Sequence, residues 1–133
     1  MDRFFVFIGA IAGFFGVALG AFAAHGLKGR LPPEMMAVFE TGVRYQMYHA
    51  LALVAVGALA ARIPGVDASA GVTAVSAPPL LRIAGSAFVV GILLFSGSLY
   101  ALAFTGIGRL GMITPLGGVA FLVGWACLAF AML

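Results

Sequence analysis

The segment "FFVFIGAIAGFFGVALGAFAA", residues 4–24, carries no charged side chain. An α-helix needs about 20 mostly apolar residues to cross the hydrocarbon core of a membrane, so this segment predicts a transmembrane helix. It also resembles a signal peptide, because Arg3 precedes it and "AFA" (21–23) would suit a cleavage site. Its apolar run exceeds the roughly 7–15 residues of such peptides, and we expect the helix to be retained.

The rest of the chain has the same apolar character. Of its 133 residues, 64% are hydrophobic and 8% are charged, whereas soluble domains carry roughly 25% charged residues. Three further apolar runs, residues 45–61, 81–104 and 112–133, are long enough to cross a membrane. We therefore predict an all-α integral membrane protein, with one domain (1–133) folded as an antiparallel four-transmembrane-helix bundle. We expect it in the bacterial cytoplasmic membrane.

The second helix should begin well before its apolar run. Pro32 and Pro33 mark its entry and Glu34 its first turn, and nothing stops a helix before Ala61. Such a helix would be about 42 Å long, whereas the hydrocarbon core is about 30 Å thick, so we expect its first part to project from the membrane or to lie along its surface. Residues 62–80, "RIPGVDASAGVTAVSAPPL", predict an exposed loop. The basic residues divide too evenly between the two sides to set the orientation.

A stripe of glycines follows the first helix. Gly9, Gly13, Gly16 and Gly20 are spaced by four, three and four residues, so they share one face. Small residues let transmembrane helices approach closely. One interpretation is that the stripe packs against another helix of the same chain. The other interpretation is that the stripe forms a homo-oligomer interface. The expected partners are therefore membrane lipid and a possible second copy of the chain.

Several classes of function are disfavoured. The net charge of +3 is spread out, and no basic run suggests a nucleic-acid partner. Cys127 is the single cysteine, which leaves no intramolecular disulfide. No cofactor motif, paired carboxylates or Ser/His/Asp order is visible. We therefore expect no cofactor and no enzymatic activity.

The stretch "GVRYQMYHA", residues 42–50, is polar for so apolar a chain. On a helix, two neighbouring rows carry the polar side chains of this region: Glu40, Arg44 and Tyr48, and Thr41, Tyr45 and His49. Polar groups in transmembrane helices usually face the bundle interior or water. We therefore expect this half of the helix to face inward, with Gln46 at its edge.

Other helices are expected to add to this polar face. His25 ends the first helix, and Arg109 and Thr114 lie between the third and the fourth, all toward the membrane face assigned to His49. Thr114 could instead cap the fourth helix. The third helix adds hydroxyls in "SGSLY". The candidate cluster comprises His25, Glu40, Arg44, Tyr45, Gln46, Tyr48, His49, Ser96, Ser98, Tyr100, Arg109 and Thr114.

Three interpretations of this cluster remain open. Arg44 and His49 could fasten helix ends, with the two tyrosines as interfacial aromatics. The cluster could line a cavity for a small ligand, a lipid headgroup or a proton. A metal site is a weaker alternative, with His25, Met47 and His49 as its candidate ligands.

Four motifs together resemble a known family. "GAFAAHGL", "TGVRYQMYHALAL", "FSGSLYAL" and "TPLGG…FLVGW" occur in an order and spacing similar to those of the small YgdD/YwdK-type membrane proteins, a domain of unknown function. The resemblance covers nearly the whole chain except residues 63–79 and implies a four-helix membrane protein. The family's signature positions correspond to His25, Gly26, Tyr45, Gln46, His49, Ser96, Gly97, Tyr100, Thr114 and Pro115.

The resemblance implies no reaction. The sequence therefore favours a non-enzymatic binding or assembly protein whose polar cluster lies at one membrane face. The alternative is a small channel or transporter for protons or a small solute, which would require a polar path onward through Ser96 and Ser98.

Overall fold

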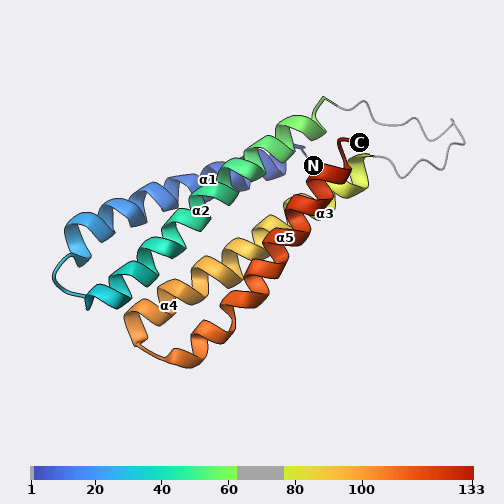
Figure 1. Cartoon of the computed structure of the whole chain (residues 1–133). Helices are drawn as coiled ribbons and strands as arrows, with labels where there is room; N and C mark the ends of the chain where they lie inside the picture. Colours follow the sequence, from blue (N-terminus) through green and yellow to red (C-terminus); the bar gives the residue numbers. More distant parts are fainter. Residues whose placement is uncertain (1, 63–76) are drawn as a thin grey trace, which may run out of the picture.

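Helices make up almost all of the computed structural model, which describes residues 2–62 and 77–133. α1 (Asp2–Phe22) continues through a π-helical turn (Ala23–Leu27), and α2 (Pro33–Ala60) returns beside it. α3 (Ala77–Gly91) runs through a second π-helical turn (Ile92–Ser96) into α4 (Gly97–Thr105). A 3₁₀ turn (Gly108–Met112) then leads into α5 (Thr114–Phe130). The two hairpins lie side by side, with both chain termini at one end (Figure 1).

Three helical segments are long and apolar enough to cross a membrane: Arg3–Leu27, Pro79–Thr105 and Gly108–Phe130. The prediction of an all-α chain with membrane-crossing helices is confirmed for these segments. α2 is 28 residues long, but it is not among these three segments. The polar residues in its first half set it apart from them. Of the predicted loop 62–80, residues 77–80 already belong to α3, and residues 63–76 lie outside the described part of the chain.

The glycine stripe of α1 lies against α2. A Cβ atom added at Gly9 would lie 2.7 Å from the Ala50 carbonyl oxygen, and one at Gly20 would lie 3.4 Å from Val43 Cγ1. The absence of side chains at these positions lets the two backbones approach. The structure therefore has the first of the two arrangements expected for the stripe, which is packing within the chain.

The start of α2 does not project from the bundle. Phe39 is fully buried, and its ring packs against those of Tyr100 and Phe104, at centroid distances of 4.9 and 5.6 Å. The π-helical turn at the end of α1 and the side chains of α4 thus cover the first turns of α2. The expectation that this part of α2 projects from the membrane or lies along its surface stays a prediction.

Aromatic rings pack on glycines between α3 and α5. The Phe121 ring contacts Gly91 of α3, and the Phe88 ring of α3 occupies the site where Gly124 of α5 lacks a Cβ atom. Phe88 and Phe121 are both buried and belong to one core cluster with Leu53 and Val56 of α2. This interlocking fixes α5 beside α3.

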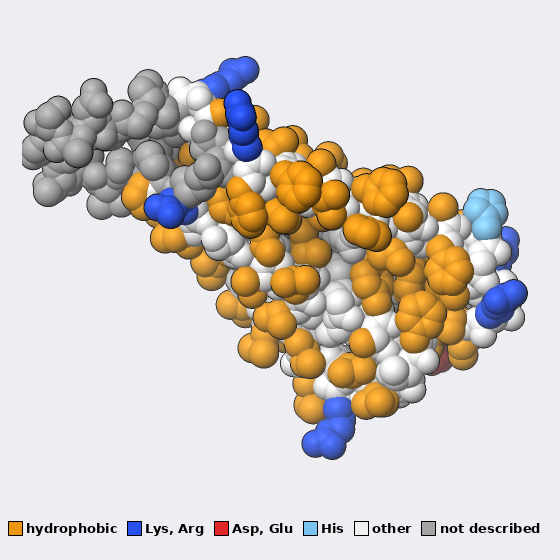
Figure 2. Space-filling view, turned by 180° about the vertical axis from the view of Figure 1, so that it is seen from behind, with side chains coloured by type: hydrophobic (Ala, Val, Ile, Leu, Met, Phe, Trp, Pro, Cys, Tyr) orange, Lys and Arg blue, Asp and Glu red, His pale blue; other side chains and the backbone are white. Residues whose placement is uncertain are grey.

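The outer surface suits a membrane. Large apolar side chains such as Phe7, Phe14, Leu51 and Leu122 are exposed. Hydrophobic side chains cover the middle of the face shown in Figure 2. Lysine and arginine side chains gather at the two ends of that view. An apolar band between charged ends is the pattern expected of a bundle surrounded by lipid.

Candidate functional site

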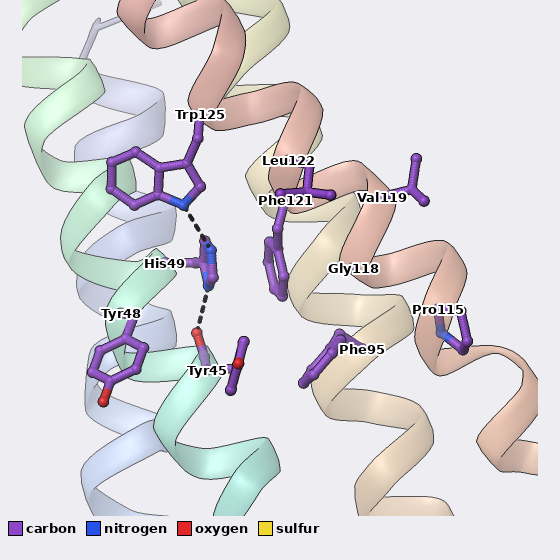
Figure 3. Close-up of a pocket in the computed structure, with 10 residues that line it drawn as sticks. All are labelled: Tyr45, Tyr48, His49, Phe95, Pro115, Gly118, Val119, Phe121, Leu122 and Trp125. Atoms are coloured by element: carbon purple, nitrogen blue, oxygen red, sulfur yellow. Dashed lines mark hydrogen bonds between the residues drawn. The ribbon is translucent and has the colours of Figure 1, made fainter.

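A groove opens along the side of the bundle between α2 and α5. α2 packs closely against α1, α3 and α4, whereas α5 packs against α3 and the second π-helical turn, so α2 and α5 stay apart. The space has a volume of about 630 Å³. We call it the α2–α5 groove; its lining residues are Tyr45, Tyr48, His49, Phe95, Pro115, Gly118, Val119, Phe121, Leu122 and Trp125 (Figure 3).

The groove extends from one end of the bundle to its middle. Pro115 stands in the first turn of α5, and Trp125 lies ten residues further along, about 15 Å away. Phe121 contacts Gly91, which is close to the midpoint of the Pro79–Thr105 segment. The Trp125 end of the groove therefore lies near the middle of the segments that are long and apolar enough to cross a membrane.

His49 bridges the groove and is only 4% exposed. One ring nitrogen, Nδ1, lies 2.7 Å from the Tyr45 carbonyl oxygen, and Trp125 Nε1 lies 3.1 Å from Nε2 (Figure 3). A carbonyl oxygen only accepts and an indole N–H only donates, so Nδ1 carries the hydrogen and Nε2 accepts from Trp125. Both nitrogens of the neutral imidazole are thus engaged by the protein.

Stacked aromatic rings line the groove. The His49 ring stacks on Phe121 with centroids 3.4 Å apart and an interplanar angle of 6°. The Tyr45 ring stacks on Phe95 at 4.5 Å, and Trp125 meets Phe88 edge-on at 5.2 Å. These contacts hold the lining rings in fixed positions, so the groove is preformed.

Two hydrogen-bonded groups tie the helices together behind the groove. The Gln46 Nε2 amide donates to the Ala12 carbonyl oxygen at 2.8 Å, and Gln46 Oε1 accepts from the Tyr100 hydroxyl at 2.8 Å. Ser96 Oγ donates to the Gly42 carbonyl oxygen at 2.7 Å. α2 is thereby bonded to α1, to α4 and to the π-helical turn.

A third tie joins α4 to α5. Ser98 Oγ donates to the Phe95 carbonyl oxygen at 2.9 Å and lies 2.8 Å from Thr114 Oγ1. Because the single hydroxyl hydrogen of Ser98 is used on the carbonyl, Thr114 is the donor between the two hydroxyls. Among the described residues, every buried side-chain nitrogen or oxygen has a hydrogen-bond partner.

Comparisons with known proteins identify the family. The profile of the family described as "Protein of unknown function (DUF423)" matches residues 19–118. The UPF0382 membrane protein YwdK of Bacillus subtilis (strain 168) is 44% identical over 129 residues, covering 97% of this chain and 95% of that protein. The chain belongs to the DUF423 family.

Other relatives agree with this assignment. A UPF0382 membrane protein of Haemophilus influenzae is 44% identical over 121 residues, covering 91% of this chain and 86% of that protein. One from Staphylococcus haemolyticus is 40% identical over 126 residues, covering 95% and 92%. No solved structure matches the chain. The resemblance inferred from the sequence motifs is thus confirmed, and this DUF423 member is a membrane protein of an uncharacterised family.

The candidate residues of this DUF423 member do not form one cluster. Tyr45, Tyr48 and His49 line the groove. Gln46, Ser96, Ser98, Tyr100 and Thr114 are the helix ties described above. The remaining four, His25, Glu40, Arg44 and Arg109, are exposed. Thr114 bonds to Ser98 and makes no capping hydrogen bond at the start of α5.

The polar half of α2 faces the bundle interior only in part, at His49. Glu40, Arg44 and Tyr48 are exposed, and the first two line a shallow hollow of about 250 Å³ beside α1. The buried half instead contains Phe39 and Ala50. For the row of Glu40, Arg44 and Tyr48 the prediction is wrong. The reason is that α2 is the central helix, so its apolar rows contact neighbouring helices on two sides.

The two histidines lie far apart. Gly13 of α1 lies beside Ala50, so His49 is near the level of Gly13, whereas His25 stands twelve residues further along the same helical rod. That offset is about 18 Å along the axis. The prediction that both histidines share one membrane face is therefore wrong, because α2 starts 16 residues before His49 and not near it.

The three candidate metal ligands do not come together in the structure. His25 is exposed at the end of the bundle, and the Met47 thioether packs on Gly16. The ring nitrogens of His49 are both occupied by protein partners. The described residues hold no group of three or more His, Cys, Asp or Glu side chains that could bind a metal ion.

Half of the groove was missed by sequence reasoning. α5 contributes Gly118, Val119, Phe121, Leu122 and Trp125, and four of these are ordinary residues of an apolar helix. Trp125 packs against Phe88 and donates a hydrogen bond to His49. The sequence offered one signal for this side of the groove, which is the single tryptophan deep in an apolar helix.

Proposed function

We propose that this protein is a four-span membrane protein that binds a neutral, apolar ligand in the α2–α5 groove without converting it. The observation that carries the proposal is the groove itself, a preformed aromatic-lined space of about 630 Å³ that opens sideways. Specific ligand sites in proteins are typically mostly apolar clefts of about 300–1,000 Å³. A sideways opening at hydrocarbon depth favours a ligand that arrives from the lipid phase.

The proposal takes α2 as the fourth span. Residues 41–60 would cover about 30 Å, the thickness of the hydrocarbon core. α2 lies beside α1 over most of its length, from Val43 opposite Gly20 to Val54 opposite Gly9. Its exposed side chains change from Glu40 and Arg44 to Leu51 further along, which suits a helix passing from headgroups into lipid. Helical spans and relatives from bacteria favour the cytoplasmic membrane.

The lining of the groove suggests the class of ligand. It contains no side chain of Lys, Arg, Asp or Glu, so a charged ligand would be left unpaired at a cost of several kcal/mol. Tyr45 and Tyr48 carry hydroxyls away from the Trp125 end of the groove, and these residues are 38% and 54% exposed. A mostly apolar molecule with one hydroxyl or carbonyl group at its end would match both features.

Binding is favoured over catalysis and over transport by the hydrogen bonds. His49 is the groove residue best suited to general acid or base catalysis, and both of its nitrogens are already bonded to the protein. A channel or transporter needs a continuous polar path. In the described residues Ser96 and Ser98, the hydroxyls expected to continue such a path, bond to Gly42, Phe95 and Thr114 and so join helices instead.

The chain offers a sharp test because its single tryptophan lines the groove. We would titrate purified protein in micelles with a brominated long-chain alcohol and follow quenching of Trp125 fluorescence. A Cβ at Gly118 would lie 4.0 Å from the nearest atoms of the Phe95 ring, so Gly118→Phe should place its ring in the groove without a clash. Gly97→Phe is the control, since nothing lies within 4 Å of a Cβ there.

We expect saturable quenching in the wild type and in Gly97→Phe. Gly118→Phe should bind about tenfold more weakly, which corresponds to about 1.4 kcal/mol. Circular dichroism would check that both variants remain helical. If all three proteins are quenched to the same extent, the probe reaches Trp125 from bulk micelle and the groove is not a binding site.

A further inference from the structure

A second space lies on the other side of α5. It is a hollow of about 420 Å³ between α3 and α5, lined by Arg82, Ile83, Ser86, Ala87, Val90, Ala120 and Val123. We call it the α3–α5 hollow. Its α5 residues differ from those of the α2–α5 groove, so the two spaces are separate. Small side chains at Ser86, Ala87 and Ala120 leave the room.

The α3–α5 hollow differs from the groove in carrying a positive charge at one end. Arg82 is exposed and stands five residues after the start of α3 at Ala77. It therefore lies at the end of the bundle that holds both chain termini (Figure 1). Val90 lies eight residues deeper, about 12 Å along the helix. The hollow is thus an apolar trough with a guanidinium group at its outer end.

The same combination occurs once more at that end. A hollow of about 380 Å³ between α1 and α2 is lined by Arg3, Val6, Phe7, Gly57, Ala58 and Ala61. Arg3 lies in the first turn of α1, so this arginine also stands at the outer end of an apolar trough. Two troughs that each end in arginine at the same end of the bundle favour the same kind of amphiphilic ligand.

We infer that the α3–α5 hollow binds an anionic phospholipid, with one acyl chain in the trough and the phosphate on Arg82. Arginine binds phosphate oxygens through two parallel N–H donors. Ile83, Ala87 and Val90 offer an acyl chain a continuous apolar contact, which a free anion could not use. This inference does not depend on what the α2–α5 groove binds.

The test compares lipid binding by four proteins in native mass spectrometry. The probes are phosphatidylglycerol and phosphatidylcholine with the same acyl chains, and inorganic phosphate serves as a competitor. Arg82→Gln removes the charge, and Ala87→Leu fills the trough but keeps the charge. The control is Arg109→Gln, which removes an exposed arginine from the opposite end.

We expect the wild type and Arg109→Gln to bind phosphatidylglycerol about fivefold more tightly than phosphatidylcholine, as one arginine near an anionic headgroup should provide. In proteins that also carry Arg3→Gln, which removes the charge from the α1–α2 trough, Arg82→Gln should lose this preference, and Ala87→Leu should bind both lipids more weakly. Inorganic phosphate should not compete. The inference is overturned if Arg82→Gln keeps the preference, if Ala87→Leu binds both lipids as the wild type does, or if phosphate alone displaces the lipid.

Discussion

Replacing Gly9 with alanine tests the packing of α1 on α2, because the same change at Gly13 provides a matched control. A Cβ at Gly9 would lie 2.7 Å from the Ala50 carbonyl oxygen, 2.9 Å from Val54 Cγ2 and 3.0 Å from Leu53 Cβ. A Cβ at Gly13 would lie 4.0 Å from the nearest atom, Ala50 Cβ. The first position is too close to a backbone atom for the neighbour to move aside easily, and the second has ordinary room.

The expected difference between the two variants follows from two effects. Alanine is better than glycine in a helix by about 1 kcal/mol, and this gain applies equally to both positions. Overpacking a close contact costs about 1–3 kcal/mol, and this cost applies only to Gly9. We therefore expect Gly13→Ala to be as stable as the wild type or slightly more stable. Gly9→Ala should be about 1–3 kcal/mol less stable than Gly13→Ala.

The assay is unfolding in mixed micelles with increasing dodecyl sulfate, followed by helicity and by Trp125 fluorescence. It should be repeated at several protein concentrations. If the stripe packs within the chain, the difference between the variants will not depend on concentration. Equal stability of the two variants would refute the described contact. If both variants are destabilised and the loss varies with concentration, the stripe is an interface between copies.

Three further outcomes follow from the hydrogen bonds and the position of the tryptophan. Gln46→Leu should lower the free energy of unfolding by about 1 kcal/mol, because two hydrogen bonds of about 0.6 kcal/mol each are lost. Tyr100→Phe removes one of these bonds and should cost about half as much. Equal losses in the two variants would contradict the shared network. Ser98→Ala combined with Thr114→Val should cost less than the sum of the single changes, by about 0.6 kcal/mol in the same titration, because both remove one bond. In bilayers, Trp125 should be quenched more by lipids brominated near the acyl-chain end than by lipids brominated near the headgroup. The reverse order would move α5 away from the described depth.

Sequence reasoning predicted the helices well because their limits are set by local signals. The helix expected from Glu34 to Ala61 is found at Pro33–Ala60, since a proline pair starts it and no breaker interrupts it. The glycine stripe likewise predicted a close contact for α1. Both signals act over a few residues, so the sequence carries them directly.

The orientation of each helix face could not be predicted in the same way. Periodicity shows that Glu40, Arg44 and Tyr48 share a face, but it does not show which neighbour that face meets. In water the apolar face turns inward, whereas in lipid an apolar face can be satisfied on either side. Contacts between distant residues, such as the bond between His49 and Trp125 across 76 positions, depend on the whole arrangement of the helices.

The bond between His49 and Trp125 has a particular place in this arrangement. Glycine packing joins α1 to α2 and α3 to α5, and buried hydroxyl and amide groups join α2 to α4. Within the described residues, α2 and α5 share this one side-chain hydrogen bond. A transmembrane hydrogen bond is worth about 0.6 kcal/mol on average, which is close to the thermal energy RT. The His49 ring is buried, so an Nε2 left without a donor would cost more than the bond itself. A ligand hydroxyl can accept from the indole and donate to Nε2 at the same time, and it would therefore replace this bond at little cost.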